Sequence, residues 1–214
     1  MMTLYGYWRS SASYRIRIAL NMKGVDYTYS PVDLVAGEQS TPKHLKRNAQ
    51  GYVPVLELED GTLLTQSLAI MDYLDATFDA PRFMPRDALL RSKILSAALV
   101  IAADTAPIQN SSVLNHIKSE YGQDQDAAMA WARSWIEKGF SALEPIAEIR
   151  ETRFLYTNDP AFFEICLTPQ VYNARRFGVN MNLFPALSEI DAACRAYPEF
   201  SKAAPENQID APHS

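Results

Sequence analysis

The sequence has little cysteine, little histidine and no motif that pairs them. Its two cysteines, Cys166 and Cys194, are far apart and form no CxxC pair. Its three histidines, His44, His116 and His213, cluster neither with each other nor with a cysteine. Structural zinc sites and disulfide frameworks need such residues at short, regular spacings, so the pattern argues against both, and we expect no metal.

Positive charge and long apolar runs are also scarce. The 20 lysines and arginines are outnumbered by 25 aspartates and glutamates, which gives a net charge of -5 at pH 7. This balance argues against nucleic acid as the main partner but permits a local basic pocket. Charges interrupt every apolar run well short of the roughly 20 residues that cross a membrane, and no basic-plus-apolar leader opens the chain. With 48% hydrophobic residues, we expect a cytoplasmic globular protein of one large domain or two small ones.

The character of the sequence changes between residues 81 and 86. Before this point short β-prone runs mix with helical ones, and after it the pattern is helical almost throughout. The break itself, DAPRFMPRD, contains Pro81 and Pro85, which suits a linker. We therefore expect a first domain at residues 1–80, a linker at 81–86 and a helical second domain at 87–214.

The first part mixes strand and helix signals. Thr3–Trp8 and VDYTYSPV are β-prone, and VPVLELEDGTLLTQS places apolar residues on both sides of Asp60-Gly61. That dipeptide is preferred in tight hairpin turns, where both central residues need positive φ. LAIMDYLDATF predicts an amphipathic helix with Ser67 as its N-cap. The stretch between Gly37 and Gln50 is expected to be irregular or helical.

The segment YRIRIAL is ambiguous when taken alone. Its apolar residues alternate with arginines as in a strand, but the serines before it and LNMKG after it favour a helix. The predicted order is then β-α-β followed by β-β-α, a small mixed sheet with helices packed against it. Arg15 and Arg17 in this segment are expected to be solvated or salt-bridged helix residues without a functional role.

The second part has the pattern of a helical bundle. One long helix is expected after Asp87 with a bend at Pro107, and a second over DAAMAWARSWIEKGFSALEPIAEI. AFFEICLTPQVYNARRFG is apolar enough for the centre of the bundle. The side chains expected in the core are Trp131, Trp135, Phe162, Phe163, Cys166 and Tyr172, whereas His44 and His116 are expected on the surface.

Four motifs resemble those of the zeta-class glutathione transferases. They are WRSSASYRIRIALNMKG, NAQGYVPVLELEDGTLLTQSLAIMDYL, ICLTPQVYNARRF and AAPENQID, which together span nearly the whole chain. The resemblance implies a thioredoxin-like N-terminal domain with a mixed four-stranded sheet and an all-helical C-terminal domain. It also implies glutathione as the cofactor and a homodimer, with the first domain of one subunit against the second domain of the other.

The resemblance answers why two serines follow the first β-prone run. Glutathione's sulfur is expected at Ser10 and Ser11, at the start of a helix. The helix dipole, free backbone N–H groups and a hydroxyl donor would there lower the thiol pKa from its reference value of about 8.5. Glutathione is regenerated in the implied reaction, in which its thiolate adds to a cis double bond and leaves after rotation.

The resemblance also implies how the rest of glutathione is held. Val53 is expected to precede a cis Pro54 and to pair its backbone with the cysteinyl amide. Gln66 and Ser67 are expected to hold the γ-glutamyl carboxylate, again at a helix start. The other positions that the resemblance assigns to the pocket are Gln39, Asn110, Ser112 and Arg176, with Gln39 toward the glycyl end.

The implied substrate is a small maleyl diketo acid, which is a dianion. An acidic protein must then supply a local cationic pocket, for which Arg9 and Arg176 are the candidates and Arg175 a weaker one. The expected activity is glutathione-dependent cis-trans isomerisation of maleylacetoacetate or a close relative. The alternatives are a maleylpyruvate isomerase, a transferase that conjugates small electrophiles such as α-halo acids, and a glutathione-binding carrier without turnover.

The sequence departs from the family pattern at several positions. Ala12 replaces the cysteine of the usual Ser-Ser-Cys-Ser, and Ala106 stands where a polar Gln or His is common, which keeps the carrier alternative open. Ser111 and Ser112 stand where some maleylpyruvate-type members carry arginines, which counts against that substrate.

A further departure lies at the start of the late helix. It begins with Ala161 and Glu164 in place of a Thr-x-x-Asp capping box. Alanine has no capping group, so we expect a loss of about 0.5–2 kcal/mol unless Asp159 takes over the role.

Overall fold

The computed structural model describes residues 1–212, and the chain divides into two compact units. The first unit comprises Met1–Arg82 together with the chain from Ala196 onward, and the second comprises Phe83–Arg195. The break after Arg82 lies inside the linker predicted at 81–86. The end of the chain differs from the prediction of one domain at 87–214, because α9 (Pro198–Ala203) packs against α1 (Ser11–Met22) in the first unit.

A mixed four-stranded sheet forms the centre of the first unit, as predicted. Its strands are β1 (Met2–Gly6), β2 (Tyr27–Pro31), β3 (Val55–Glu57) and β4 (Leu63–Thr65), in the order β2-β1-β3-β4. β1 is parallel to β2 and antiparallel to β3, which is antiparallel to β4. A parallel pair needs a crossover connection, and α1 supplies it, so YRIRIAL is helical as predicted.

The hairpin between β3 and β4 is present, but its turn differs from the prediction. Leu58 N–H donates to the carbonyl of Thr62 at 2.8 Å, and Gly61 N–H donates to the carbonyl of Leu58 at 3.0 Å. Gly61 has a φ of 84°, whereas Asp60 is not among the residues with positive φ. Asp60 and Gly61 are therefore not the two central residues of a two-residue turn, and the loop is of the longer kind in which a left-handed glycine closes a turn.

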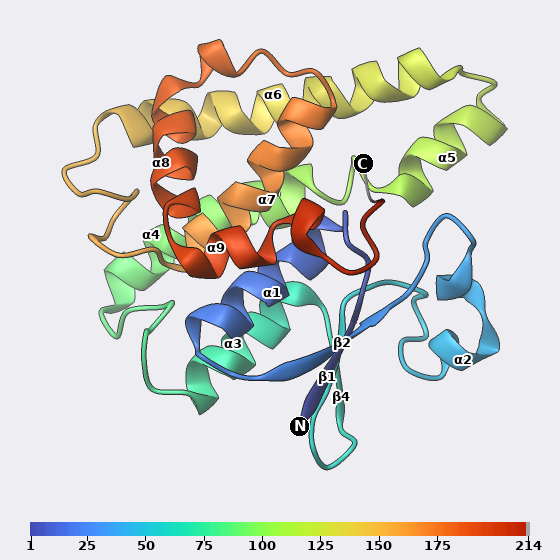
Figure 1. Cartoon of the computed structure of the whole chain (residues 1–214). Helices are drawn as coiled ribbons and strands as arrows, with labels where there is room; N and C mark the ends of the chain where they lie inside the picture. The colour runs from blue at the N-terminus through green and yellow to red at the C-terminus, as the bar shows by residue number, and fades with distance from the viewer. Residues whose placement is uncertain (213–214) are drawn as a thin grey trace. The chain divides into compact units, whose positions relative to one another are not determined.

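The helices of the first unit lie on both sides of its sheet. α1 and α3 (Ser67–Thr77) lie together on one side, and the short α2 (Pro42–Leu45) lies on the other (Figure 1). The 3-10 turn η1 (Glu38–Ser40) precedes α2, so the stretch between Gly37 and Gln50 contains short helical turns and irregular segments, as expected. The N-cap of α3 is Gln66 and not Ser67, which is already the first helical residue.

α1 is buried along most of its length. α3 and α9 both pack against it, and the chain after α9 continues through a 3-10 turn, η4 (Pro205–Asn207). Arg15 is 3% exposed and Arg17 is 0% exposed, so the expectation of solvated arginines is wrong. The physical reason is that α3 and α9 both pack against α1, and that Arg15 and Arg17 bond groups in or beside these packed segments: Arg15 bonds Ser67, and Arg17 bonds the carbonyl of Ala203.

The second unit is helical, as predicted. Its elements are α4 (Ala88–Leu99), a π-helical turn η2 (Val100–Thr105), α5 (Ser111–Glu120), α6 (Gln125–Glu148), α7 (Phe162–Arg176), η3 (Met181–Leu183) and α8 (Pro185–Arg195). α7 packs against both α4 and α8, and every residue from Phe162 to Val171 is buried, so this segment is the predicted centre of the bundle. Instead of one helix bending at Pro107, regular structure stops at Thr105 and restarts at Ser111.

The exposure of individual side chains matches the expectations unevenly. Phe162, Phe163 and Cys166 are buried as expected. Trp131 is 41% exposed, so its placement in the core is wrong, because its indole N–H reaches out to the carbonyl of Ile108 at 3.1 Å. The remaining two aromatic residues expected in the core, Trp135 and Tyr172, are only partly buried.

The start of α7 shows how an alanine N-cap is tolerated. Glu164 accepts the N–H of Ala161 at 3.0 Å through one carboxylate oxygen and the N–H of Leu155 at 3.0 Å through the other. The carboxylate half of a capping box is thus present, and Glu164, not Asp159, satisfies the backbone here. In residues 1–212 no helix combines the length and the apolar character that a membrane crossing requires.

Candidate active site

The N-terminus of α1 presents an anion-binding turn. Ser10 is the N-cap, and its Oγ accepts the N–H of Ser13 at 3.2 Å. Because this oxygen acts as an acceptor toward the helix, its hydroxyl hydrogen is left to donate elsewhere. Ser11 is the first helical residue, and first-turn N–H groups such as those of Ser11 and Ala12 have no acceptor within the helix. The turn therefore offers a thiolate a hydroxyl donor, backbone N–H groups and the positive end of a helix dipole.

The start of α3 is a second anion-binding turn. Gln66 has a φ of 66°, a conformation that costs a non-glycine residue roughly 1–3 kcal/mol. Ser67 is buried, and its Oγ accepts from Nη1 of Arg15 at 3.1 Å. The Ser67 hydroxyl can therefore donate outward, next to first-turn N–H groups that the helix leaves without acceptors. A carboxylate is the kind of ligand that this turn stabilises.

The loop before β3 is fixed from outside the sheet. The peptide bond between Val53 and Pro54 is cis, as predicted. The carbonyl of the preceding Tyr52 accepts from Nε2 of His44 at 2.9 Å and from Nδ2 of Asn48 at 3.0 Å. His44 is 2% exposed, so the expectation of a surface histidine is wrong, and its Nε2 must carry the hydrogen. Sequence reasoning missed both donors, although both lie within ten residues of Val53.

These groups fit glutathione. The Oε1 atom of Gln39 is buried and has no hydrogen-bond partner among the described residues, which is unusual unless a ligand or water supplies a donor. The start of α1 suits a thiolate, and the start of α3 suits a carboxylate. The pairing of the Val53 backbone with glutathione and the reach of Gln39 to its glycyl end stay predictions.

Arg9 borders a cavity of about 340 Å³ in the first unit. The lining comes from the β1–α1 loop, the segment after β2 and the end of the chain, and it includes two carboxylates, Asp33 and Asp210. The Arg9 guanidinium lies over the Trp8 ring, 5.3 Å from its centroid. A dianion in this cavity would meet one guanidinium and two carboxylates, so Arg9 alone does not make a dianion site.

The predicted residues of the second unit lie at two helix ends. Asn110 is the N-cap of α5, and its Oδ1 accepts the N–H of Ser112 at 3.3 Å, so both residues have a capping role. Arg176 is the last residue of α7 and is exposed, with its guanidinium 4.6 Å from the centroid of the Phe177 ring. Arg175 bonds Asp191 at 2.9 Å, so part of its hydrogen-bonding capacity is already used within the protein.

Other chemistries have little support in the described part of the chain. The Tyr5 hydroxyl donates to Glu57 at 2.7 Å, and this bond raises the pKa of Tyr5, so the phenol is not poised to ionise. Within residues 1–212 no three His, Cys, Asp or Glu side chains group as a metal site would require, and His213 lies outside the described residues. The described cysteines, Cys166 and Cys194, are buried.

Comparison with known proteins identifies the family. Residues 1–76 match the glutathione S-transferase N-terminal domain. A probable maleylacetoacetate isomerase of Vibrio cholerae is 44% identical over 211 residues, covering 97% of this chain and 97% of that protein. The holo structure of a maleyl pyruvate isomerase, a bacterial zeta-class transferase, is 35% identical with a TM-score of 0.95 and covers 98% of this chain and 100% of its own.

A further solved structure contains ligands. Maleylacetoacetate isomerase of Methylobacterium extorquens AM1 with bound malonate and GSH is 33% identical, with a TM-score of 0.95, covering 99% of this chain and 100% of its own. These similarities extend over both units of the chain. The protein described here belongs to the family of zeta-class glutathione transferases and maleylacetoacetate isomerases.

Proposed function

We propose that this protein is a glutathione-dependent cis-trans isomerase of maleylacetoacetate or a closely related maleyl diketo acid. The observation that carries the proposal is the pair of anion-binding turns at Ser10 and Ser67, which begin two helices on the same side of one sheet. One turn suits the thiolate of glutathione and the other suits its γ-glutamyl carboxylate. Family membership provides the substrate class.

Ser10 is the residue that sets the protonation state of the cofactor. Glutathione supplies, when bound, the thiolate that adds reversibly to the cis double bond. The Ser10 hydroxyl donates to this sulfur, and the dipole of α1 and the N–H groups of Ser11 and Ala12 stabilise the same negative charge. Each of these interactions lowers the pKa of the thiol and so raises the thiolate fraction at neutral pH.

The remaining contacts hold glutathione in one position. Ser67 donates to the γ-glutamyl carboxylate while it accepts from Arg15, and Gln66 contributes to the same end. Val53 and Gln39 bind the cysteinyl and glycyl parts. Pre-organised contacts of this kind fix the sulfur relative to the substrate, which is where much of the rate of an addition reaction originates.

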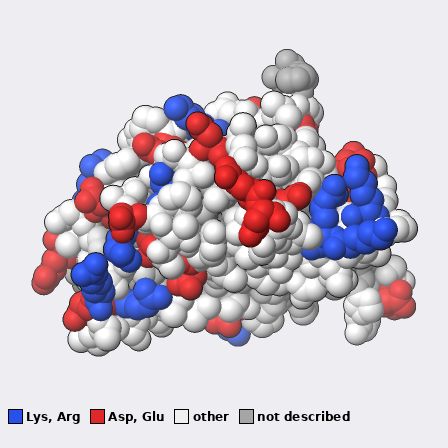
Figure 2. Space-filling model, turned by 90° about the horizontal axis from the view of Figure 1, so that it is seen from below, with Lys and Arg blue, Asp and Glu red and all other residues white. Residues whose placement is uncertain are grey.

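The substrate carboxylates require cations from this acidic protein. Figure 2 shows acidic and basic side chains on one face in small groups of each sign, not as one field of a single sign. A local arginine, not the overall charge, must therefore attract the dianion. Arg176 is the proposed candidate because the family resemblance assigns it to the pocket and its side chain is exposed at the end of α7, whereas Arg9 shares its cavity with two carboxylates. Asn110 and Ser112 are proposed to contribute polar contacts beyond their capping role.

The test is to follow substrate and thiol together. Isomerisation consumes maleylacetoacetate while the total free thiol stays constant, whereas conjugation to α-halo acids depletes thiol in step with product. A carrier binds glutathione and produces neither change. Maleylpyruvate assayed beside maleylacetoacetate separates the two isomerase activities. A chain that consumes thiol, or that leaves both maleyl substrates unchanged, is not the proposed enzyme.

The assembly and location are part of the same proposal. A homodimer is expected, and a solution mass near the 24.0 kDa of one chain would contradict it. A cytoplasmic location is supported by the proposed use of glutathione, because the reducing cytosol maintains a glutathione pool.

A further inference from the structure

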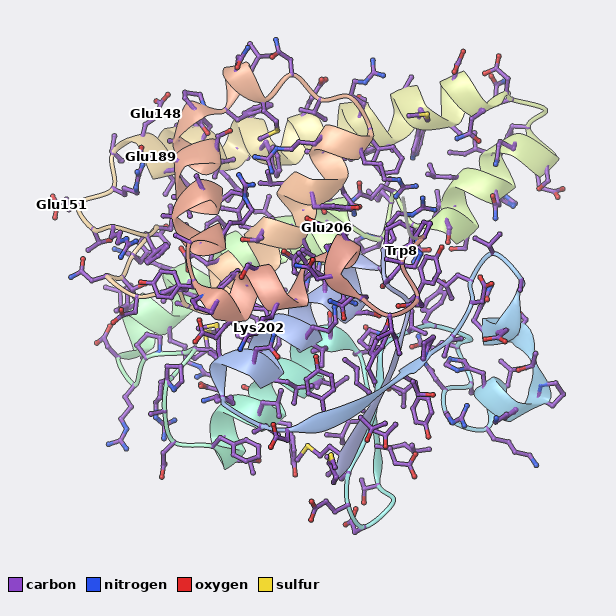
Figure 3. The ribbon with its side chains drawn as sticks, in the orientation of Figure 1. Trp8, Glu148, Glu151, Glu189, Lys202 and Glu206 are labelled. Carbon is purple, nitrogen blue, oxygen red and sulfur yellow. The ribbon has the colours of Figure 1, made fainter. Side chains whose placement is uncertain are left out.

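The backbone of Trp8, two residues before Ser10, is held on both of its polar groups. Its N–H donates to Oδ2 of Asp210 at 2.9 Å. Its carbonyl accepts from Nη2 of Arg17 at 2.9 Å. Figure 3 shows Trp8 beside the chain segment that follows α9, in agreement with the first of these bonds. Asp210 and Arg17, which lie about 200 positions apart in the sequence, thus hold the two peptide groups on either side of the Trp8 Cα.

Arg17 connects this loop to the end of the chain. Its Nε donates to the carbonyl of Ala203 at 2.9 Å, and its Nη1 donates to the carbonyl of Tyr7 at 3.4 Å. The side chain is fully buried, and burial lowers the pKa of its guanidinium. Burying a charge costs several kcal/mol unless hydrogen bonds compensate it, and here three backbone carbonyls do so. The three hydrogen bonds of Arg17 therefore connect the β1–α1 loop, at Tyr7 and Trp8, with the end of the chain, at Ala203.

The β1–α1 loop is in turn hydrogen-bonded to the anion-binding turn at Ser10. The N–H of Ser10 donates to the carbonyl of Tyr7 at 3.0 Å, the same carbonyl that accepts from Arg17. Asp210 is itself fixed, because its Oδ2 also accepts from the Tyr29 hydroxyl at 3.3 Å. A shift of Trp8 would move Tyr7 or Arg9, and either change displaces the hydroxyl of Ser10. None of these hydrogen bonds involves Ser67, which belongs to the other anion-binding turn, at the start of α3.

We propose that Asp210 and Arg17 are positioning residues for the sulfur end of the glutathione site, and that the end of the chain is thereby part of the active-site support. The proposal rests on the proposed function, because it makes Asp210 and Arg17 the support of Ser10, the residue proposed to activate the thiol. It predicts a selective defect. Loss of Asp210 impairs the ionisation of bound glutathione and turnover more than it impairs glutathione binding.

The experiment compares three substitutions at Asp210 with a matched control. Asp210→Ala removes the acceptor, Asp210→Asn restores an acceptor oxygen without the charge, and Asp210→Glu keeps the charge but displaces the acceptor by one methylene. The control is Asn21→Ala. Asn21 also connects α1 with the last part of the chain, because its Nδ2 donates to the carbonyl of Glu199 at 2.9 Å. This bond does not involve the β1–α1 loop. For each, kcat, KM and Kd for glutathione and the pKa of the bound thiol are measured, the last by thiolate absorbance.

The expected result separates Asp210 from the control. Asp210→Ala lowers kcat by roughly 10-fold or more, since a displacement near 1 Å can cost about 10²-fold, and raises the bound thiol pKa. Its Kd for glutathione changes little, Asp210→Asn regains most of the activity, and Asn21→Ala behaves as wild type in kcat and thiol pKa. If Asp210→Ala does not fold, Asp210→Glu decides the question with the same readouts.

Equal effects of Asp210→Ala and Asn21→Ala, or an unchanged kcat and thiol pKa in the Asp210 variants, would overturn the positioning role. A wild-type chain that binds glutathione but isomerises neither maleyl substrate would instead refute the proposed function. In that event the thiol pKa of bound glutathione in the same variants still decides whether Asp210 positions Ser10.

Discussion

Ser10 combines two roles that a pair of substitutions can separate. As the N-cap of α1 it accepts the N–H of Ser13, and as the proposed thiol activator it donates its hydroxyl. Ser10→Ala removes both, whereas Ser10→Gly removes the hydroxyl but keeps a residue that caps helices well. Replacing a serine cap by alanine costs about 0.5–2 kcal/mol and by glycine only a few tenths. For a chain of 214 residues the alanine variant should melt roughly 2–4 °C lower per kcal/mol lost.

The chemical effect should be the same in both variants. A hydrogen bond to a charged group contributes about 1.5–3 kcal/mol, which corresponds to roughly 1–2 units of thiol pKa. Titration of bound glutathione by thiolate absorbance should therefore show an equal upward shift for Ser10→Ala and Ser10→Gly, with a matching loss of kcat at neutral pH. Ser11→Ala serves as the neighbouring control and should retain the cap. If the shift instead follows the melting temperature, and glycine resembles wild type, the hydroxyl is not the donor.

Three further predictions concern other buried groups. Arg15→Met should raise the Kd for glutathione about 10-fold through the loss of support for Ser67, with little change in bound thiol pKa, and an unchanged Kd would refute that role. Burial raises the pKa of Glu164 from 4.5 to about 7, so the folded state holds its proton longer than the unfolded one. Stability should therefore fall by about 3 kcal/mol as pH rises from about 4.5 to about 7, and denaturant titrations of Glu164→Gln should lack that part of the pH dependence. Gly139→Ala should destabilise the second unit by about 1–3 kcal/mol, because the added Cβ would overlap Oγ1 of Thr105; an unchanged melting temperature would contradict this packing.

The regular elements and the family could be predicted from the sequence because their signals are local. The hairpin, the helix that begins near Ser67 and the long apolar α7 each follow from a periodicity or a turn residue within a short window. The comparisons confirm the family and the fold class expected from the four motifs, whereas the isomerase activity of this chain is a proposal. The roles of the individual site residues stay predictions, because only their local geometry is known.

The errors arise where distant segments decide the outcome. The expectation of His44 on the surface is wrong, because its ring is buried and bonds the carbonyl of Tyr52, eight residues further along the chain. The end of the chain was assigned to the helical domain because it follows that domain in sequence. No periodicity near the end of the chain reveals that its carbonyls accept from α1 or that Asp210 accepts from Trp8 and Tyr29, since these pairings depend on the folded path of distant segments.

The two arginines of α1 show why contacts between distant segments matter for function. Positions i and i+2 of a helix point about 200° apart, so Arg15 and Arg17 reach opposite sides of α1. Arg15 contacts Ser67 in the carboxylate turn, and Arg17 contacts the loop that leads to Ser10 in the thiolate turn. Taking a charge out of water has a large desolvation penalty, so a buried charged group is weak evidence for a gain in stability. Stability alone therefore does not account for two guanidinium groups inside one helix, whereas the need to hold two anion-binding turns in a fixed relation does.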